Sequence, residues 1–367
     1  MKPDFALELA PNVAIVVLTL IGALVAGVYA AQRAGKVPRL WLQGAVVLGV
    51  VLATPVAAPL LDEPLPAYFA MLMMGFIVAF SVAVVWAVRI GIDHEEIIDL
   101  GLVCLITGVA GARILHVFVD GYFMDYVHLC TDHTLVQWPL PRGQCTAEIG
   151  GAWDAAAGVC RPAEGDCFAW MKFWNGGLVW YGGLIGASFA GIYFLKRVGL
   201  PVLKVVDVAG YAIPLGVFFG RLGCWFGGCC FGVQSDSWLA VRFPAWSPAS
   251  EKQYREHLLD HPGVESLAVL PAQLFEAVGC LVIAAFCMMW LHPRKRFDGQ
   301  VFVVSMALYA VLRFFLEIIR ADDRGGVLGV STSQWIGLLA LAGLGVAYAK
   351  LRERAKARLS APLPDAA

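Results

Sequence analysis

The sequence predicts an all-α protein, a polytopic membrane bundle of about nine transmembrane helices with small periplasmic caps. Hydrophobic residues make up 59% of the chain and the mean hydropathy is +0.72. Charged residues make up only 15%, well below the roughly 25% of an average soluble domain. The apolar residues also gather into runs of about 20, the length that an α-helix needs to cross a bilayer.

Nine apolar runs are expected to form the spans, in the order 11–31, 40–61, 67–88, 99–119, 174–195, 205–223, 271–292, 300–319 and 331–350. No convincing basic segment precedes the first run, so it is expected to be a retained span and not a cleaved signal peptide. The stretches 121–170 and 224–270 are too polar to span a membrane and too short for large domains. They are expected to form caps on the outer face.

Lysines and arginines set the expected orientation, because they prefer cytoplasmic connections. Basic residues follow the first, third, fifth, seventh and ninth runs, as at Arg33, Arg89, Lys196, Arg294 and Lys350. The alternate connections are acidic or hold the four cysteines of the 121–170 insertion. The amino terminus is therefore expected in the periplasm and the carboxyl terminus in the cytoplasm of a bacterial inner membrane. The formal net charge of −1 offers no basic field for nucleic acid.

Ten cysteines fall into two groups. Cys130, Cys145, Cys160 and Cys167 lie in the insertion that is expected to face the periplasm, where disulfides form. Four cysteines allow three pairings, and the sequence does not choose among them.

Several ionisable residues fall inside the apolar runs, where each needs a partner, a cavity or a function. Arg113 and Arg221 lie toward the outer ends of two runs. Spacings of four, four and three place a further set on one helical face, namely Tyr309, Arg313, Glu317 and Arg320. Tyr68 and Tyr181 open two other runs from the same side.

Each of these residues also has a purely structural interpretation. Arg320 can extend its side chain to the interface, Tyr68 can be an interfacial aromatic, and Glu317 can simply neutralise Arg313. One glutamate cannot neutralise Arg113, Arg221 and Arg313 together, however. The surplus positive charge favours an anion, and a guanidinium matches the phosphate of a phospholipid headgroup.

Small residues repeat at every fourth position of the run after Gly176, at 182, 186 and 190 and at 183, 187 and 191. This pattern is typical of closely packed membrane helices. Gly182 and Gly183 also lie beside Tyr181 and would leave room there for a headgroup or an acyl chain.

The stretch Gly220-Arg221-Leu222-Gly223-Cys224-Trp225-Phe226-Gly227-Gly228-Cys229-Cys230-Phe231-Gly232 resembles the signature of the prolipoprotein diacylglyceryl transferases, G-R-[IL]-G-N-F-x-N-x-E-x-x-G. Further blocks follow in the family's order, at 111–113, 176–186, 271–276 and 309–334. The resemblance covers residues 65–350, with 1–64 as two additional helices and 351–367 as a basic cytoplasmic tail. The core then has seven helices and includes the insertion 121–170 and the loop 224–270.

The resemblance implies transfer of a diacylglyceryl group from phosphatidylglycerol to the cysteine thiol of a preprolipoprotein lipobox, by a monomer without metal or organic cofactor. Arg221 and Arg313 would hold the phosphate and stabilise the leaving group. Tyr309 and Glu317 would orient these arginines, while Tyr68, Arg113 and Arg320 would line the lipid site. Tyr181 is implied as a catalytic residue, and Gln273 and Glu276 are further substrate-binding candidates.

The chain departs from the family pattern at four positions. Cys224, Gly227 and Cys229 replace Asn, Asn and Glu of the signature, and Tyr181 stands where many members have a histidine. With an ordinary pKa near 10, tyrosine is a poor general base at neutral pH. The group that deprotonates the thiol stays open, as does action on another lipid or acceptor.

Two other classes of function remain open. Cys224, Cys229 and Cys230 suit a membrane thiol redox protein, although they form no Cys-x-x-Cys pair and adjacent cysteines make strained disulfides. A metal site is disfavoured at these thiols because no histidine accompanies them at a familiar spacing. A channel or transporter would also place arginines in the membrane, but no internal repeat is visible.

Overall fold

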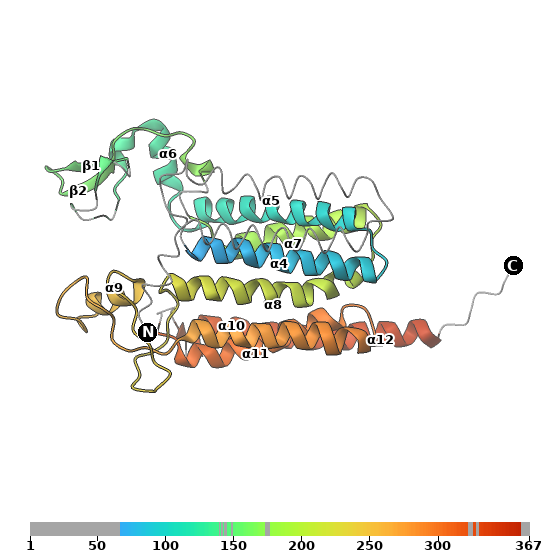
Figure 1. Cartoon of the computed structure of the whole chain (residues 1–367). Helices are drawn as coiled ribbons and strands as arrows, with labels where there is room; N and C mark the ends of the chain where they lie inside the picture. The colour runs from blue at the N-terminus through green and yellow to red at the C-terminus, as the bar shows by residue number, and fades with distance from the viewer. Residues whose placement is uncertain are drawn as a thin grey trace, which may run out of the picture. The chain divides into compact units, whose positions relative to one another are not determined.

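The computed structural model describes residues 67–138, 140, 142, 145–147, 150–172, 177–321, 326–327 and 330–360. This part of the chain is mostly helical (Figure 1) and divides into two compact units. Unit 1 contains residues up to Ile92 and from Leu203 onward, and unit 2 contains Asp93–Val202. The expected spans 11–31 and 40–61, and with them the domain predicted for 1–64, lie outside the described residues.

Unit 1 is a bundle of long helices with one short helix in a connecting loop (Figure 1). Its elements are α4 (Ala67–Arg89), α8 (Val202–Phe226), α9 (Pro248–Arg255), α10 (Ala272–Ala285), a π-helical turn η7 (Phe286–Leu291), a 3₁₀ turn η8 (His292–Arg294), α11 (Gln300–Ile319), the two-residue strands β3 (Gly326–Val327) and β4 (Val330–Ser331), and α12 (Thr332–Ser360). The strands pair antiparallel.

The core of unit 1 joins four of these helices. Buried Tyr211 of α8, Cys287 of η7 and Val301 of α11 belong to one apolar cluster, against which Trp86 of α4 packs. Between helices that cross a membrane, such a cluster is held by van der Waals packing and not by the exclusion of water. α8 and α11 also approach closely at Gly210, where a Cβ would lie 2.9 Å from the Cα of Phe302. The core therefore sets the mutual positions of α8, α10 and α11.

A buried aspartate holds the start of α11. The Asp207 carboxylate of α8, 0% exposed, accepts hydrogen bonds from the amides of Gly299, Val301 and Phe302 at 2.9, 2.9 and 3.2 Å. Lys295 Nζ lies 2.8 Å from the same carboxylate. The first amides of a helix lack partners within it and carry a partial positive charge, so a carboxylate here stabilises the helix.

A reciprocal cap begins α12. Gln334 N donates to Ser331 Oγ at 3.2 Å, and Ser331 N donates to Gln334 Oε1 at 3.1 Å. A serine followed three residues later by glutamine is the sequence signature of such a capping box. The helix continues to Ser360, so the first ten residues of the predicted tail 351–367 extend the last helix.

Unit 2 is built on the pair α5 (His94–Val119) and α7 (Trp180–Arg197). Their glycines meet directly: a Cβ at Gly111 would lie 2.5 Å from the oxygen of Gly182, and one at Gly186 would lie 2.5 Å from the oxygen of Thr107. Gly191 similarly faces Cys104. The close approach predicted from the small-residue repeat is confirmed.

The segment between α5 and α7 contains α6 (Phe123–Thr131), the 3₁₀ turns η2 (His133–Leu135) and η5 (Ala169–Met171), and the antiparallel strands β1 (Gly151–Asp154) and β2 (Val159–Pro162). Its cysteines form two disulfides, Cys130–Cys167 and Cys145–Cys160. Arg161 Nε lies 2.9 Å from Asp154 Oδ2 across the hairpin, and hydrogen bonding from Arg161 lowers the pKa of Asp154. The insertion is a small, cross-linked cap.

Six helices of the described chain are long and apolar enough to cross a membrane: Ala70–Arg89, His94–Val119, Val202–Phe226, Ala272–Arg294, Gln300–Ile319 and Ser333–Ala357. Six of the seven spans expected there have such a counterpart. The expected span 174–195 does not, and its start was wrong: α7 begins at Trp180 because Gly177 has a left-handed φ of +68° and Val179 is extended. The span expected at 99 begins at His94, since Asp93 caps the Glu95 amide.

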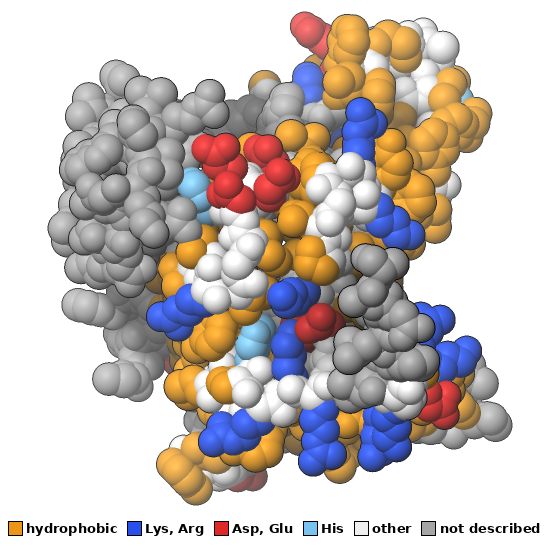
Figure 2. All heavy atoms as spheres, turned by 90° about the vertical axis from the view of Figure 1, so that its right-hand side faces the viewer, with side chains coloured by type: hydrophobic (Ala, Val, Ile, Leu, Met, Phe, Trp, Pro, Cys, Tyr) orange, Lys and Arg blue, Asp and Glu red, His pale blue; other side chains and the backbone are white. Residues whose placement is uncertain are grey.

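Figure 2 views the molecule from the right-hand side of Figure 1, the end at which α4 finishes and α8 begins. Lys and Arg side chains are spread over this face among hydrophobic ones, and a compact group of Asp and Glu side chains lies on it as well. In unit 1, α4 ends on Arg89 and η8 contains Arg294; in unit 2, α7 ends on Lys196 and Arg197. These residues belong to the set from which a cytoplasmic side was predicted.

Candidate functional site: arginines around a buried carboxylate

The charged cluster of unit 1 is centred on Glu276. This glutamate of α10 is 0% exposed. Its Oε2 lies 3.0 Å from Arg221 Nε and 3.7 Å from Arg320 Nη1, and its Oε1 accepts a hydrogen bond of 3.1 Å from the Tyr309 hydroxyl. Burying a carboxylate costs several kcal/mol unless it is paired in this way. The cluster joins the end of α8, the first turns of α10, the middle of α11 and the residue that follows α11.

A second ion pair lies farther along α11. Arg313 Nη2 is 2.6 Å from Glu317 Oε2, one turn away, and both side chains are largely buried. The pair is close but is not aligned for a hydrogen bond, and Arg313 Nη1 has no hydrogen-bond partner among the described residues. The helical face predicted from the spacing is therefore polar, with one ion pair of its own.

Unit 1 thus contains three arginines that pair with two carboxylates. Arg221 and Arg320 share Glu276, while Arg313 pairs with Glu317. Charges in these surroundings are poorly screened by water. A guanidinium presents several donors in a planar fork that matches phosphate oxygens. The arrangement is suited to bind an anion.

Three cysteines lie beside this cluster. The Sγ atoms of Cys224, Cys229 and Cys230 are all within 4.8 Å of one another, and Arg221 Nη1 lies 3.8 Å from Cys224 Sγ. Hydrogen bonds from Cys224 and Cys229, with a further contribution from Arg320, lower the pKa of the Cys230 thiol. The cysteine-bearing part of the motif and the arginines therefore belong to one site.

The turn that presents these cysteines is fixed by hydrogen bonds. Cys229 N donates to Cys224 O at 3.1 Å, and buried Gln273 of α10 donates from Nε2 to Cys229 O at 2.7 Å. The turn also needs left-handed backbone at Gly228, φ +63°, and at Cys230, φ +61°. Gln273 thus acts on the cysteine turn, while Glu276, one helical turn later, acts on the arginines.

Tyr68 of α4 lies against the same part of α8. A Cβ at Gly223 would be 3.1 Å from the backbone carbonyl oxygen of Tyr68 and 3.2 Å from the Tyr68 ring. The Tyr68 side chain is 36% exposed. The structure therefore brings Tyr68 next to the signature motif. That Tyr68 lines a lipid site stays a prediction.

An apolar cavity of about 190 Å³ adjoins the turn on another side. It is lined by Phe226, Gly227, Gly228, Phe243 and the segment 244–248. None of the charged residues of the Glu276 cluster lines it, so this cavity is not where the anion would bind.

Arg113 belongs to unit 2 and has different partners. Its Nε and Nη2 donate to the carbonyls of Trp170 and Ala169, both at 2.7 Å, and Nη1 donates to Gly177 O at 3.2 Å. Its guanidinium carbon also lies 5.3 Å from the centre of the Tyr126 ring. Arg113 thus ties α5 to the loop that leads into α7. The expected convergence of Arg113 with Arg221 and Arg313 on one phosphate stays a prediction.

The other predicted residues of unit 2 lie in the first turn of α7. Tyr181 is 50% exposed and packs edge-on against Trp180, with ring centres 5.3 Å apart. Gly182 is buried against Gly111, and Gly183 faces Gly108. The two glycines therefore have a packing role, while Tyr181 is open to its surroundings.

Sequence reasoning underrated one residue and missed one relationship. Glu276 was only a further candidate, yet it is the shared partner of Arg221, Arg320 and Tyr309. The available signal was a glutamine and a glutamate three positions apart, at 273 and 276, in an otherwise apolar helix. Nothing in the sequence, beyond the closeness of the three positions, indicated that two arginines would lie beside Cys224, Cys229 and Cys230.

Comparison with known proteins identifies relatives over most of the chain. The curated phosphatidylglycerol–prolipoprotein diacylglyceryl transferase of Clostridium tetani is 23% identical over 78% of this chain and 93% of its own length. The enzyme of the same name from Corynebacterium diphtheriae is 27% identical over 79% of this chain and 90% of its own length. That of Nitratidesulfovibrio vulgaris is 32% identical over 47% of this chain and 56% of its own length.

A family model described as prolipoprotein diacylglyceryl transferase matches residues 163–349, half of the chain. The match contains α7, α8, α10 and α11, and with them the signature motif, Glu276 and the polar face of α11. The chain belongs to the prolipoprotein diacylglyceryl transferase family.

Proposed function

We propose that this protein transfers a diacylglyceryl group from phosphatidylglycerol to the lipobox cysteine thiol of a preprolipoprotein. Family membership and the names of the relatives in Clostridium tetani and Corynebacterium diphtheriae support this activity. The structural observation that carries it is the sharing of one buried carboxylate, Glu276, by Arg221 and Arg320. The two guanidiniums gathered at this carboxylate supply the planar sets of donors that a lipid phosphate requires.

In the proposed reaction the substrate sulfur attacks the glycerol carbon that carries the phosphate ester. The new carbon–sulfur bond replaces the carbon–oxygen bond, glycerol phosphate leaves with the bonding electron pair, and the thiol proton is released. Arg221 and Arg313 bind the phosphate and stabilise the charge that grows on the leaving group. Holding lipid and thiol together in a confined site supplies a further part of the acceleration.

The remaining residues have supporting roles in this proposal. Glu276 and Tyr309 hold Arg221 in position, and Glu317 does the same for Arg313. Tyr68, Arg113, Arg320 and Tyr181 line the lipid site, with Gly182 and Gly183 beside it. Gln273 positions the turn that follows the signature arginine.

We further propose that the protein acts as a monomer in the bacterial inner membrane, with its substrates at the periplasmic face. The disulfide-linked cap of unit 2 supports an oxidising compartment on that side. Arg89 ends α4 in unit 1, and Lys196 and Arg197 end α7 in unit 2; each supports a cytoplasmic location for that end of its own unit. The amino terminus is then periplasmic and the carboxyl terminus cytoplasmic.

The test is a transfer reaction with the full-length protein in phospholipid nanodiscs. Labelled phosphatidylglycerol and a lipobox peptide are supplied, and mass spectrometry follows the diacylglyceryl thioether. A peptide with serine in place of the lipobox cysteine should give no product. Arg221→Ala should reduce the rate by about 10²–10³-fold, the usual cost of losing a donor to a developing anion.

Arg296→Ala is the matched control, because Arg296 is an exposed arginine of unit 1 outside the cluster; it should retain activity. Product from the serine peptide, or equal rates for Arg221→Ala and Arg296→Ala, would refute the assignment. Phosphatidylethanolamine and cardiolipin as donors test action on another lipid: a product from one of these, and none from phosphatidylglycerol, would reassign the substrate.

A further inference from the structure

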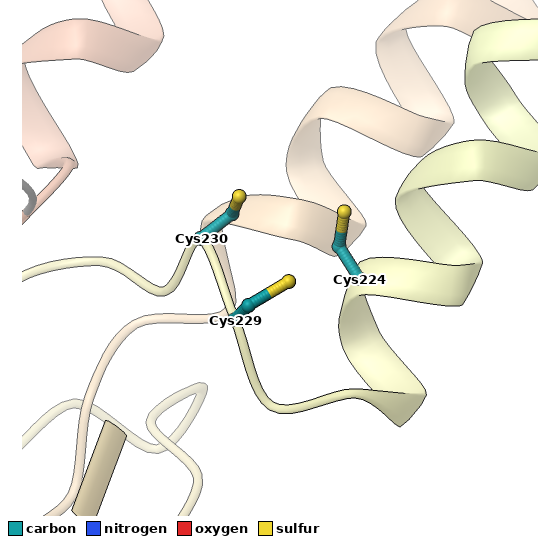
Figure 3. Close-up of side chains that lie close together, drawn as sticks. All are labelled: Cys224, Cys229 and Cys230. Atoms are coloured by element: carbon teal, nitrogen blue, oxygen red, sulfur yellow. The ribbon is translucent and has the colours of Figure 1, made fainter. Parts of the chain in front are cut away.

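The turn after α8 gathers three thiols in a way that the transfer reaction does not use. Cys224 lies in the last turn of α8 and Cys229 and Cys230 lie in the following loop, and the three sulfur atoms gather in the space between helix and loop (Figure 3). All three Sγ atoms lie within 4.8 Å of one another, and none of the three is in a disulfide. Cys224 is buried, and the other two are half-buried.

The spacing is close to that of a metal–thiolate site. In a triangle with edges of 4.8 Å, the centre lies about 2.8 Å from each corner, and a zinc–sulfur bond is about 2.3 Å. Each sulfur would need to move inward by at most about 0.5 Å, which small side-chain rotations supply. Thiolates select soft cations such as Cu(I) and Zn(II) over the hard cations Mg²⁺ and Ca²⁺.

The turn is held in place before any ligand arrives. Hydrogen bonds fix it on both sides, from Cys229 N to Cys224 O and from Gln273 to Cys229 O. Cys230 has a left-handed φ of +61°, a conformation that costs a residue with a side chain about 1–3 kcal/mol. The surrounding structure thus holds the backbone of Cys230 in an uncommon conformation.

A metal cation binds cysteine as the ionised thiolate, and positively charged arginines near the three cysteines favour that ionised form. Arg221 Nη1 lies 3.8 Å from Cys224 Sγ, and Arg320 pairs in the antiparallel sense with Gly232, two residues beyond Cys230. Three thiolates bring three negative charges, so a monovalent or divalent cation leaves the centre anionic. Arg221 and Arg320, which also pair with Glu276, lie beside the centre and reduce that remaining charge. Arginine at this position therefore stabilises the loaded centre and does not repel it.

We propose that Cys224, Cys229 and Cys230 form a three-thiolate site for a soft cation of the Cu(I) and Zn(II) class. The site would occupy the positions at which the family signature carries other residues, so it would be a property of this chain in addition to lipid transfer. A three-coordinate centre suits Cu(I), while Zn(II) would add a water as fourth ligand. The proposal does not depend on the transferase activity.

The test uses full-length protein purified in detergent without oxygen, with its two disulfides intact. Cu(I) is titrated against bicinchoninate, and Zn(II) is titrated separately against a chromophoric chelator. We expect one tightly bound equivalent in at least one of these titrations. X-ray absorption should then find sulfur neighbours at about 2.2–2.4 Å.

Cys224→Ser and Cys230→Ser should each weaken binding by more than about 100-fold, beyond the loss from a missing outer-shell partner. Cys104→Ser is the control: Cys104 is also a free, half-buried thiol, but it lies in unit 2 and outside the cluster. Its variant should bind the metal as the parent does.

Protection in the parent protein makes the test independent of how the variants fold. The bound cation should slow alkylation of Cys229 and Cys230, read by peptide mass mapping, while Cys104 is unaffected. Absence of a tight equivalent in both titrations, or equal binding by Cys224→Ser and the parent, would overturn the proposal.

Discussion

Each unit contains an arginine whose guanidinium is paired within the unit, and the two arginines are paired in opposite ways. In unit 1, Arg221 pairs with the carboxylate of Glu276. In unit 2, Arg113 donates to three neutral backbone carbonyls, from Trp170, Ala169 and Gly177. Carboxylate pairing controls charge, whereas carbonyl bonding fixes the path of the chain. The comparison suggests that unit 1 carries the electrostatics of the site and that Arg113 shapes the loop before α7.

The largest effect is expected from removing the carboxylate that pairs with Arg221. Glu276→Ala leaves Arg221 and Arg320 without the carboxylate that they share, and removing one partner of a buried ion pair costs about 3–5 kcal/mol. Thermal unfolding in detergent, followed by circular dichroism, should show the loss. Glu256→Ala, at an exposed carboxylate paired with Lys252, should change stability little. Equal unfolding temperatures for the two variants would contradict the role given to Glu276.

The next effect concerns the cap of unit 2. Cys145 and Cys160 are joined across a sequence separation of 15 residues, and a disulfide that closes a loop of this size contributes about 3 kcal/mol. The double substitution Cys145→Ser with Cys160→Ser should make β1 and β2 sensitive to protease. Cys280→Ser with Cys287→Ser, which removes two free thiols of unit 1, should leave the cap as resistant as before. A protease-resistant cap without its disulfide would show that the hairpin is held by other contacts.

The third prediction tests the hydrogen bonds from Arg113 to backbone carbonyls. Arg113→Ala removes the guanidinium that holds the carbonyls of 169, 170 and 177, and a hydrogen bond to a charged group contributes roughly 1.5–3 kcal/mol. Amide hydrogen exchange should rise in 169–172 and at the start of α7. Exchange around Glu276 should not change if the role of Arg113 is confined to its own unit. A rise in both places would instead support the predicted convergence of Arg113 with the unit 1 arginines.

The smallest expected effect compares two glycines. A Cβ at Gly111 would lie 2.5 Å from the backbone oxygen of Gly182, whereas a Cβ at Gly220 meets nothing within 4 Å. Gly111→Ala should therefore destabilise the protein by about 1–3 kcal/mol, the usual cost of overpacking. Gly220→Ala should be neutral or slightly stabilising, because alanine favours helix over glycine. Thermal unfolding distinguishes the two, and a tolerated Gly111→Ala would mean that α5 and α7 separate readily.

Local patterns predicted the features that depend on one helix. The spacing of Tyr309, Arg313 and Glu317 predicted a polar face of α11, and the structure shows the Arg313–Glu317 pair one turn apart. The small residues of α7 predicted the close approach to α5. Both predictions need only the 3.6-residue period, which a single sequence displays.

Features that join distant segments were beyond such reasoning. Arg221 and Glu276 lie 55 residues apart, and no periodicity links α8 to α10. The start of α7 was placed too early because hydropathy does not register the left-handed Gly177. Sequence spacing also could not show that the sulfur atoms of Cys224, Cys229 and Cys230 lie within 4.8 Å of one another.

The buried Asp207 has a consequence for where chemistry takes place in the membrane. By accepting the first amides of α11 it fixes how far that helix is inserted relative to α8. Tyr309 and Arg313 follow two and three turns later. The contact between Asp207 and the start of α11 therefore sets the position of both side chains along the axis of the helix. A slip of α11 by a single turn would move both side chains by about 5.4 Å, enough to carry Arg313, the group proposed to bind phosphate, out of reach of a headgroup. Substitutions at Asp207 should therefore change which lipid depth the site can serve before they unfold the bundle.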